Sequence, residues 1–148
     1  MLPYDEDIHR PVLHLLLFFG HLTQGEAMAK DKRSKFYAGD NIAMKIPSHE
    51  YSATVQFYRD VIGLPQIENM LPDIVFKFGD KRLWLDAVDH ISQAEIWLEI
   101  QTDNVTAAAE YLDQKEIIRC DKIESLPQGF EGFWITSPAN IIHLVSGD

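Results

Sequence analysis

The sequence predicts an α+β fold in which two βαβββ modules pair to form a curled mixed sheet around a cleft, after an N-terminal extension. Three observations support this fold. Alternating apolar residues indicate strands, a helical apolar pattern follows the first strand of each half, and the same order of elements occurs twice. The second copy starts at Glu95, 54 residues after the first copy starts at Asn41.

The first module covers about residues 41–90. Its first strand is expected at 41–46, where Ile42, Met44 and Ile46 alternate with other residues. Pro47 breaks this strand, Ser48 can begin a helix that continues through 51–64, and Gly63 can end it. Three shorter strands are predicted at 66–70, 74–79 and 82–88.

The second module covers about residues 95–146 and repeats this order. A strand is expected at 95–101, with Ile96, Leu98 and Ile100 on one face. Asp103 or Asn104 can then cap a helix whose apolar residues recur at i, i+3, i+4 and i+7 from Val105 to Leu112. The remaining strands are predicted at 117–123, 130–136 and 141–145.

The two copies align without a gap. A shift of 54 residues places Ile42, Met44 and Ile46 on Ile96, Leu98 and Ile100, and it also places Ala53 on Ala107 in the helices. Because strand alternation and helix phase agree in one continuous register, the sequence indicates a duplicated unit.

Each module leaves one sheet face without a helix, so two modules can enclose a cleft between these faces. Strand side chains alternate between faces, and the residues between the apolar positions are therefore expected in the cleft. The facing of Trp134 stays open, since Phe133 and Ile135 compete for the buried side. The expected cleft residues are Asn41, Ala43, Lys45, Arg82, Trp84, Asp86, Glu95, Trp97, Glu99, Ile141, His143 and Val145.

Composition excludes several classes of partner. The formal net charge is −10, from 13 Lys and Arg against 23 Asp and Glu, and such a surface disfavours binding to nucleic acid or to anionic membranes. The single cysteine, Cys120, cannot form an internal disulfide, which indicates a reducing compartment. A cytoplasmic location is expected.

Residues 1–36 are expected to form a partly helical extension before a single domain at 37–148. Residues 12–19 are apolar, but they are too few to span a bilayer. Three interpretations remain: a short helix that packs on the domain or on a partner, an upstream extension with Met28 as the true start, and a signal peptide. Acidic residues at positions 5–7 count against the last one.

Three segments resemble the vicinal oxygen chelate superfamily, which includes glyoxalases, bleomycin resistance proteins and extradiol dioxygenases. They are FYRDVIGL at 57–64, IQTDNVTAAAEYL at 100–112 and SPANIIHL at 137–144, and the resemblance covers residues 41–146. It implies paired βαβββ modules and, in metal-dependent members, a divalent ion held by His or Glu on the first and last strands of each module. That ion chelates substrate oxygens or activates dioxygen.

The resemblance also predicts that this metal centre is lost. The Glu of the closing motif falls on His143, which can still bind a metal, but ungapped counting places Ala43 and Trp97 at first-strand positions. No cofactor is therefore expected. The alternative is a divalent metal (Fe, Mn, Zn or Ni) held by Asn41, Asp86, Glu95 and His143.

The sequence thus favours a protein that binds a small organic molecule in an aromatic-lined cleft, without the metal. The predicted ligand-binding residues are Trp84, Asp86, Trp97, Glu99 and His143. The simpler interpretation is that the tryptophans fill a collapsed cleft. Alternatives are a metal-dependent lyase or dioxygenase, a metal-free isomerase with His143 as the candidate catalytic residue, and an accessory role in a homodimer. Whether the chain is an enzyme, and which ligand it takes, stay open.

Overall fold

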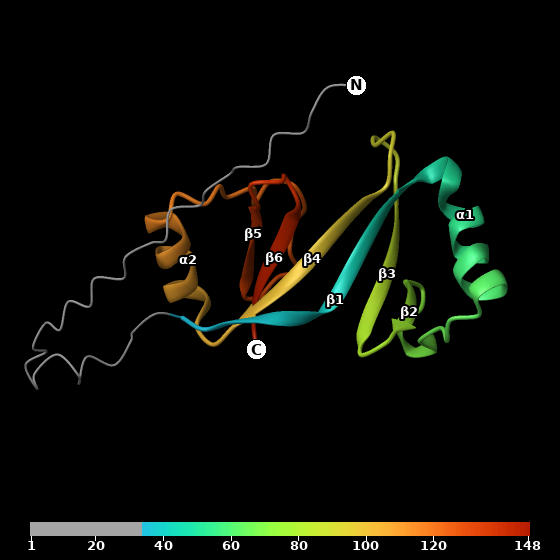
Figure 1. The fold of residues 1–148 in the computed structure, drawn as a ribbon, viewed down its shortest axis with the longest axis horizontal. Helices are drawn as coiled ribbons and strands as arrows, with labels where there is room; N and C mark the ends of the chain where they lie inside the picture. The colour runs from blue at the N-terminus through green and yellow to red at the C-terminus, as the bar shows by residue number, and fades with distance from the viewer. Residues whose placement is uncertain (1–33) are drawn as a thin grey trace, which may run out of the picture. The chain divides into compact units, whose positions relative to one another are not determined.

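The computed structural model describes residues 34–148 (Figure 1). The predictions for the N-terminal extension, including residues 12–19 and the start at Met28, therefore lie outside the described residues. Within the described residues, no helix is long and apolar enough to cross a membrane.

Six strands form one mixed sheet, in the order β2-β3-β1-β4-β6-β5. The central strands β1 and β4 are antiparallel, whereas β3 runs parallel to β1 and β6 runs parallel to β4. Each module therefore contributes three strands in mirrored order, which confirms the α+β class and the paired modules. The strands are β1 (Phe36–Pro47), β2 (Ile74–Phe78), β3 (Lys81–Val88), β4 (Glu95–Thr102), β5 (Gly132–Thr136) and β6 (Ile142–Gly147).

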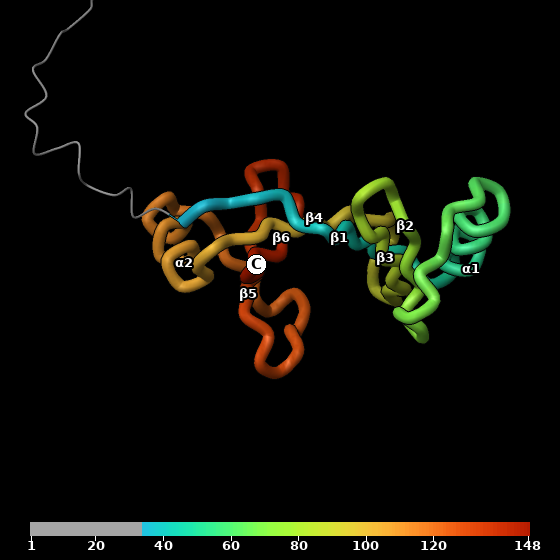
Figure 2. The backbone as a smooth tube through the Cα atoms, turned by 90° about the horizontal axis from the view of Figure 1, so that it is seen from below, coloured from blue at the N-terminus to red at the C-terminus, as the bar shows by residue number. Residues whose placement is uncertain are grey.

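The helices lie at opposite ends of this sheet in both views (Figures 1 and 2). Helix α1 (Ser48–Gln56) continues into a π-helical segment, Phe57–Ile62, which ends at Gly63 with a left-handed φ of 76°. Helix α2 (Val105–Gln114) starts at Asn104, whose side chain accepts a hydrogen bond from the Ala107 amide at 2.9 Å. The capping role of Asn104 is thus confirmed, whereas Ser48 makes no capping bond and instead donates to Asp89.

Both helices cover the same face of the sheet, called here the helix face. The pairs Ile42–Leu98 and Ile100–Val145 connect the two halves in one register, so the apolar cores under α1 and α2 lie on one side. The opposite side is called the inner face. The buried core residues are Ile46, Val55, Phe76, Leu83 and Leu85 under α1, and Ala108, Phe133, Ile135 and Val145 under α2.

Strand β1 begins at Phe36, five residues earlier than expected. Its first residues pair with the end of β4, and an irregularity between Ala38 and Ile42 shifts the register. Gly39 lies in this irregularity against the side chain of Glu99, and a Cβ atom at Gly39 would clash with the Oε1, Cγ and Cβ atoms of Glu99. The close approach therefore explains why a glycine stands at this position.

The predictions of strands at 66–70 and 117–123 are wrong, because neither segment forms a regular strand. Only single bridges form there, between Gln66 and Phe76 and between Arg119 and Ile135, and Glu68–Met70 is a 3₁₀ turn. Backbone hydrogen bonds still join these segments to β2 and β5, which are the outermost strands of the sheet.

Candidate functional site

The inner face carries most of the residues predicted for the cleft. Lys45 of β1 pairs directly with Asp86 of β3 and with Glu95 of β4, so three charged residues lie in one row across adjacent strands. One step along, Ala43 pairs with Trp84 and Trp97. Side-chain bonds between these strands occur on this same face, which confirms the facing predicted for β1, β3 and β4.

The facing predicted for the last strand is wrong. His143 pairs with Leu98 and Ile135 on the helix face, and Val145 is fully buried in the core under α2. Ile141 lies just before β6 begins. The inner face of β6 is formed by Ile142, Leu144 and Ser146, and Trp134 pairs with Leu144 there, which settles the facing of Trp134. His143 is therefore separated from the other predicted site residues by the thickness of the sheet.

Lys45 is the centre of the inner-face site. Its residue exposure is only 5%, and its Nζ atom donates to Asp86 Oδ2 and to Glu124 Oε1, each at 2.9 Å. The same ammonium lies 4.3 Å from the centre of the Trp97 ring, a cation–π distance. Two carboxylates and an indole thus surround one buried cation.

These neighbours keep Lys45 charged. Burial alone would lower the pKa of Lys45, but the hydrogen bonds that its ammonium donates to Glu124 and Asp86, together with the charges of these carboxylates, outweigh the burial and raise the pKa above its ordinary value. The group is therefore an ammonium at neutral pH. It can act as a fixed cation, and it is a poor general base.

Two tryptophans anchor the second module to this site. Trp97 and Trp134 pack edge to face with ring centres 5.3 Å apart, and Trp97 Nε1 donates to Glu95 Oε2 at 3.0 Å. Trp134 Nε1 donates to the backbone carbonyl of Glu124 at 2.9 Å, and this bond holds the Glu124 loop over the inner face. The loop position brings the Glu124 carboxylate to Lys45.

A second polar cluster lies further along β1. Asn41 Oδ1 accepts hydrogen bonds from Arg82 Nε at 3.0 Å and from Trp84 Nε1 at 2.8 Å, while its Nδ2 donates to Glu99 at 2.9 Å. Trp84 is thus engaged in an internal network. Asn41 and Glu99 join the two modules there, and within residues 34–148 neither side chain forms a hydrogen bond with His143 or Asp86.

A cavity of about 300 Å³ opens beside Lys45. Trp97 supplies an aromatic wall, and the polar groups come from Lys45, His90, Glu95 and Glu124. Sequence reasoning missed His90 and Glu124, since both lie in loops, where strand alternation carries no signal. The lining residues are Lys45, Val88, His90, Ile91, Glu95, Trp97, Ile123 and Glu124.

The residues present do not fit the divalent ion that the fold suggests. Inner-face positions on four strands carry Ala43, Trp84, Trp97 and Leu144, none of which ligates a metal through a charged or imidazole group. The alternative set of Asn41, Asp86, Glu95 and His143 is not brought together, because His143 lies on the other face. Across residues 34–148, no three His, Cys, Asp or Glu side chains are arranged to hold a metal.

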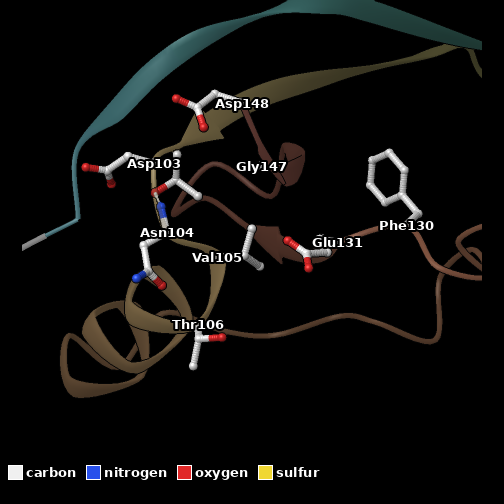
Figure 3. A pocket seen from close by; sticks show the side chains of 10 residues that line it. Asp103, Asn104, Val105, Thr106, Phe130, Glu131, Gly147 and Asp148 are labelled. Atoms are coloured by element: carbon white, nitrogen blue, oxygen red, sulfur yellow. Dashed lines mark hydrogen bonds between the residues drawn. The ribbon is translucent and has the colours of Figure 1, made fainter.

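A larger hollow, of about 510 Å³, lies at the start of α2 (Figure 3). Three carboxylates, from Asp103, Glu131 and Asp148, border it together with Phe130. The Asp103 carboxylate already accepts the Lys35 amide at 3.0 Å, and no side-chain cation borders the hollow. Its charged side chains are all acidic, whereas the cavity beside Lys45 combines an indole wall with charges of both signs, so we place the candidate site on the inner face.

Solved structures with this architecture are enzymes of several activities. A Mn(II)-bound glyoxalase from Novosphingobium aromaticivorans matches with a TM-score of 0.54 and 18% identity, over 78% of this chain and 40% of its own. A methylmalonyl-CoA epimerase from Mycobacterium tuberculosis matches with a TM-score of 0.51 and 9% identity, over 74% of this chain and 87% of its own. A homoprotocatechuate 2,3-dioxygenase variant from Brevibacterium fuscum matches with a TM-score of 0.53 and 14% identity, over 78% of this chain and 33% of its own.

These matches show the fold. The chain has the fold of the glyoxalase and extradiol dioxygenase, or vicinal oxygen chelate, proteins, and it spans two fifths of the length of the matched glyoxalase. No model of a known protein family matches the sequence, and no curated protein is significantly similar to it. Activity does not follow from the fold, because one architecture carries many chemistries.

Proposed function

We propose that this protein binds a small organic molecule in the cavity beside Lys45, without a metal centre. The observation that carries the proposal is the cavity itself, which combines an indole wall with a small number of convergent polar groups. Its volume of about 300 Å³ lies at the lower end of the range for small-molecule sites.

The walls suggest the shape of the ligand. Trp97 offers an aromatic surface that its own neighbours hold in place, through the edge-to-face contact with Trp134 and the hydrogen bond to Glu95. Val88, Ile91 and Ile123 add apolar surface. A flat ring that packs on Trp97 would be bound with little loss of side-chain entropy in the protein, because the indole is already ordered.

The charges suggest which ligands are disfavoured. Two carboxylates, Glu95 and Glu124, line the cavity against a single ammonium, and that ammonium is already paired with Asp86 and Glu124. An anionic ligand would meet an excess of negative charge in a protein whose net charge is −10. We therefore expect neutral or cationic aromatic compounds to bind better than anionic ones.

Tryptophan fluorescence tests the proposal. A panel of flat aromatic compounds, with neutral, cationic and anionic members on the same ring systems, is titrated into the full chain. We expect quenching by neutral or cationic members, and a loss of affinity of about tenfold or more in Trp97→Phe, since one well-packed aromatic contact is of that order. Trp84→Phe is the matched control, because Trp84 bonds to Asn41 in the other cluster. Absence of any quenching or thermal stabilisation across the panel would refute the proposal.

A second candidate function, a metal-free isomerase or lyase, is favoured by one observation. His90 lines the same cavity as Glu95 and Glu124, so an imidazole and two carboxylates face one bound molecule. An imidazole and carboxylates placed against one substrate are the groups that general acid–base catalysis uses. The test uses a compound that binds in the fluorescence experiment and carries an acidic C–H bond. His90→Gln should slow its hydrogen exchange with solvent by about 100-fold, measured by NMR, and leave binding intact.

A further inference from the structure

Three cationic side chains gather at the hairpin that joins β2 to β3. Lys77 of β2 and Arg82 of β3 are directly paired in the antiparallel register, and Lys81 follows the turn between the two strands. Arg82 pairs in turn with Asn41 of β1, so Lys77 and Arg82 lie on the inner face. Like charges at directly paired positions destabilise a sheet, and the stability of the hairpin therefore does not explain this cluster.

The carboxylates of residues 34–148 leave these cations largely unpaired. Neither Lys77 nor Arg82 forms an ion pair with any of these residues, and Lys81 reaches only its neighbour Asp80, with 3.8 Å between Nζ and Oδ2. The Asp80 side chain is 87% exposed, so solvent weakens this pair. The cluster thus keeps its positive charge for a ligand.

The Arg82 side chain is held in one orientation and still has free donors. Its Nε donates to Asn41 Oδ1 at 3.0 Å, and the Asn41 amide is fixed by further bonds with Trp84 and Glu99. Within residues 34–148 the two Nη groups of Arg82 have no hydrogen-bond partner, and no buried side-chain nitrogen is left unpaired, so these groups are open to solvent. A guanidinium fixed in this way can contact two oxygens of one phosphate group.

The three cations border one hollow of about 400 Å³. Asp40 and Asp80 border it as well, so the cations exceed the carboxylates by one. The Asp80 carboxylate extends into solvent, which leaves the hollow with an excess of positive charge although the chain carries a net charge of −10. Such a local reversal of charge attracts small anions.

We propose that this hollow, called here the hairpin site, binds the phosphate group of a small phosphate monoester. A phosphate dianion has three acceptor oxygens, enough to contact Lys77, Lys81 and Arg82 together, whereas a carboxylate has two oxygens and a single charge. The site is separate from the cavity beside Lys45. Arg82 and Asp86 are four residues apart on β3, which is about 13 Å at about 3.3 Å per residue.

Nuclear magnetic resonance of the indole N–H groups tests the hairpin site. The chain has three tryptophans, and Trp84 donates to the same Asn41 oxygen as Arg82, so its indole signal reports on this site. Methyl phosphate is titrated into the full chain at constant ionic strength and at about pH 8, where the phosphate is a dianion. We expect a saturable shift of the Trp84 signal at millimolar concentrations, while the Trp97 and Trp134 signals stay in place. Trp84→Phe assigns the signal by removing it.

Two substitutions and a control test which side chains bind the anion. Arg82→Gln and Lys77→Gln each remove one charge and should each weaken binding by about tenfold, because each removes a charge-assisted hydrogen bond. Lys122→Gln removes the same charge from an exposed position in the second module and should bind like the wild type. Acetate at equal ionic strength should bind at least about tenfold more weakly than methyl phosphate.

Several outcomes would overturn the proposal. It is wrong if the Trp84 signal does not saturate, or if Lys77→Gln and Lys122→Gln weaken binding equally, because net charge alone would then explain the effect. A shift of the Trp97 signal in place of the Trp84 signal would assign the anion to the cavity beside Lys45. If Arg82→Gln does not fold, Lys77→Gln decides, since Lys77 is exposed and takes no part in the bonds to Asn41.

Cosedimentation with vesicles distinguishes a free monoester from a lipid headgroup. The vesicles contain phosphatidylcholine and phosphatidic acid, which presents the same phosphate chemistry on an anionic surface. We expect no cosedimentation, because that surface repels a chain with a net charge of −10. Cosedimentation that Lys77→Gln abolishes, without a shift by methyl phosphate, would assign the hairpin site to a membrane surface and contradict the proposal.

Discussion

The two modules agree on one face of the sheet and differ on the other. Under the helices, Phe76 of the first module and Phe133 of the second both lie in buried apolar cores. On the inner face, the last strand of the first module presents Arg82, Trp84 and Asp86, whereas that of the second presents Ile142, Leu144 and Ser146. The need to pack a helix constrains one face of both modules, while the other face is free to differ.

The candidate site forms because the two modules carry different residues on the inner face. Lys45 and Asp86 come from the first module, and Glu95, Trp97 and Glu124 come from the second, so neither module contains the site alone. In the antiparallel register Lys45 lies opposite Glu95, which is the counterpart of Asn41, so two equal copies would place Lys45 opposite an asparagine. In the present site a cation from one copy meets carboxylates from both.

The largest loss of stability is expected for substitutions on the helix face. Phe76→Ala and Phe133→Ala each remove a nearly inaccessible ring, with exposures of 0% and 3%, and should each lower the free energy of unfolding by about 3–5 kcal/mol. Urea denaturation measures this loss. Phe78→Ala is the control, because Phe78 is exposed and should cost less than about 1 kcal/mol. A near-wild-type Phe133→Ala would show that the two cores are not equivalent.

An intermediate loss of stability is expected where β1 and β4 connect the two modules. In Gly39→Ala the new Cβ would clash with the Oε1, Cγ and Cβ atoms of Glu99, so the Glu99 side chain must move. That movement breaks its bonds to the Asp40 amide and to Asn41, and we expect a loss of about 1–3 kcal/mol in unfolding free energy. A double-mutant cycle with Glu99→Gly provides the control, because the Cβ atom of Glu99 would itself lie 2.6 Å from the new Cβ atom. If Gly39→Ala costs as much in that background, the contact with Glu99 is not the cause.

The smallest loss of stability is expected at the N-termini of the two helices, and it should differ between α1 and α2. Asn104→Ala removes the side-chain cap of α2 and should lower the unfolding free energy by about 1 kcal/mol. Ser48→Ala removes only an exposed hydrogen bond to Asp89, since α1 has no side-chain cap, and should cost less than about 0.5 kcal/mol. Thermal denaturation of both variants compares them, and the reverse order would contradict the capping assignment.

Alternation and repetition were enough to predict the fold. The 54-residue shift placed β1 on β4, and these are the two central strands of the sheet. Alternation also placed Lys45, Trp84, Asp86, Trp97 and Glu99 on the inner face. It could do so because the opposite face of these strands is apolar, which leaves only one register that buries the right side chains.

The same reasoning failed where both faces are apolar. Residues 141–145 read Ile-Ile-His-Leu-Val, so alternation does not distinguish the two faces, and the strand parity chosen for this segment assigned His143 to the wrong one. The loops fail for a different reason. His90 and Glu124 reach the cavity through chain reversals outside the strands, and their position depends on long-range contacts such as the Trp134–Glu124 bond. The ligand-binding role of the predicted residues stays a prediction.

The single bridges at Gln66 and Arg119 have a consequence for self-association. They supply backbone partners to the outermost strands, through Ile67 to Val75 and Cys120 to Trp134 among others. A rim that is partly hydrogen-bonded in this way is a poorer template on which another chain could continue the sheet. Copies of this protein that meet along these edges would gain fewer backbone hydrogen bonds, so contacts between side chains would carry more of the association.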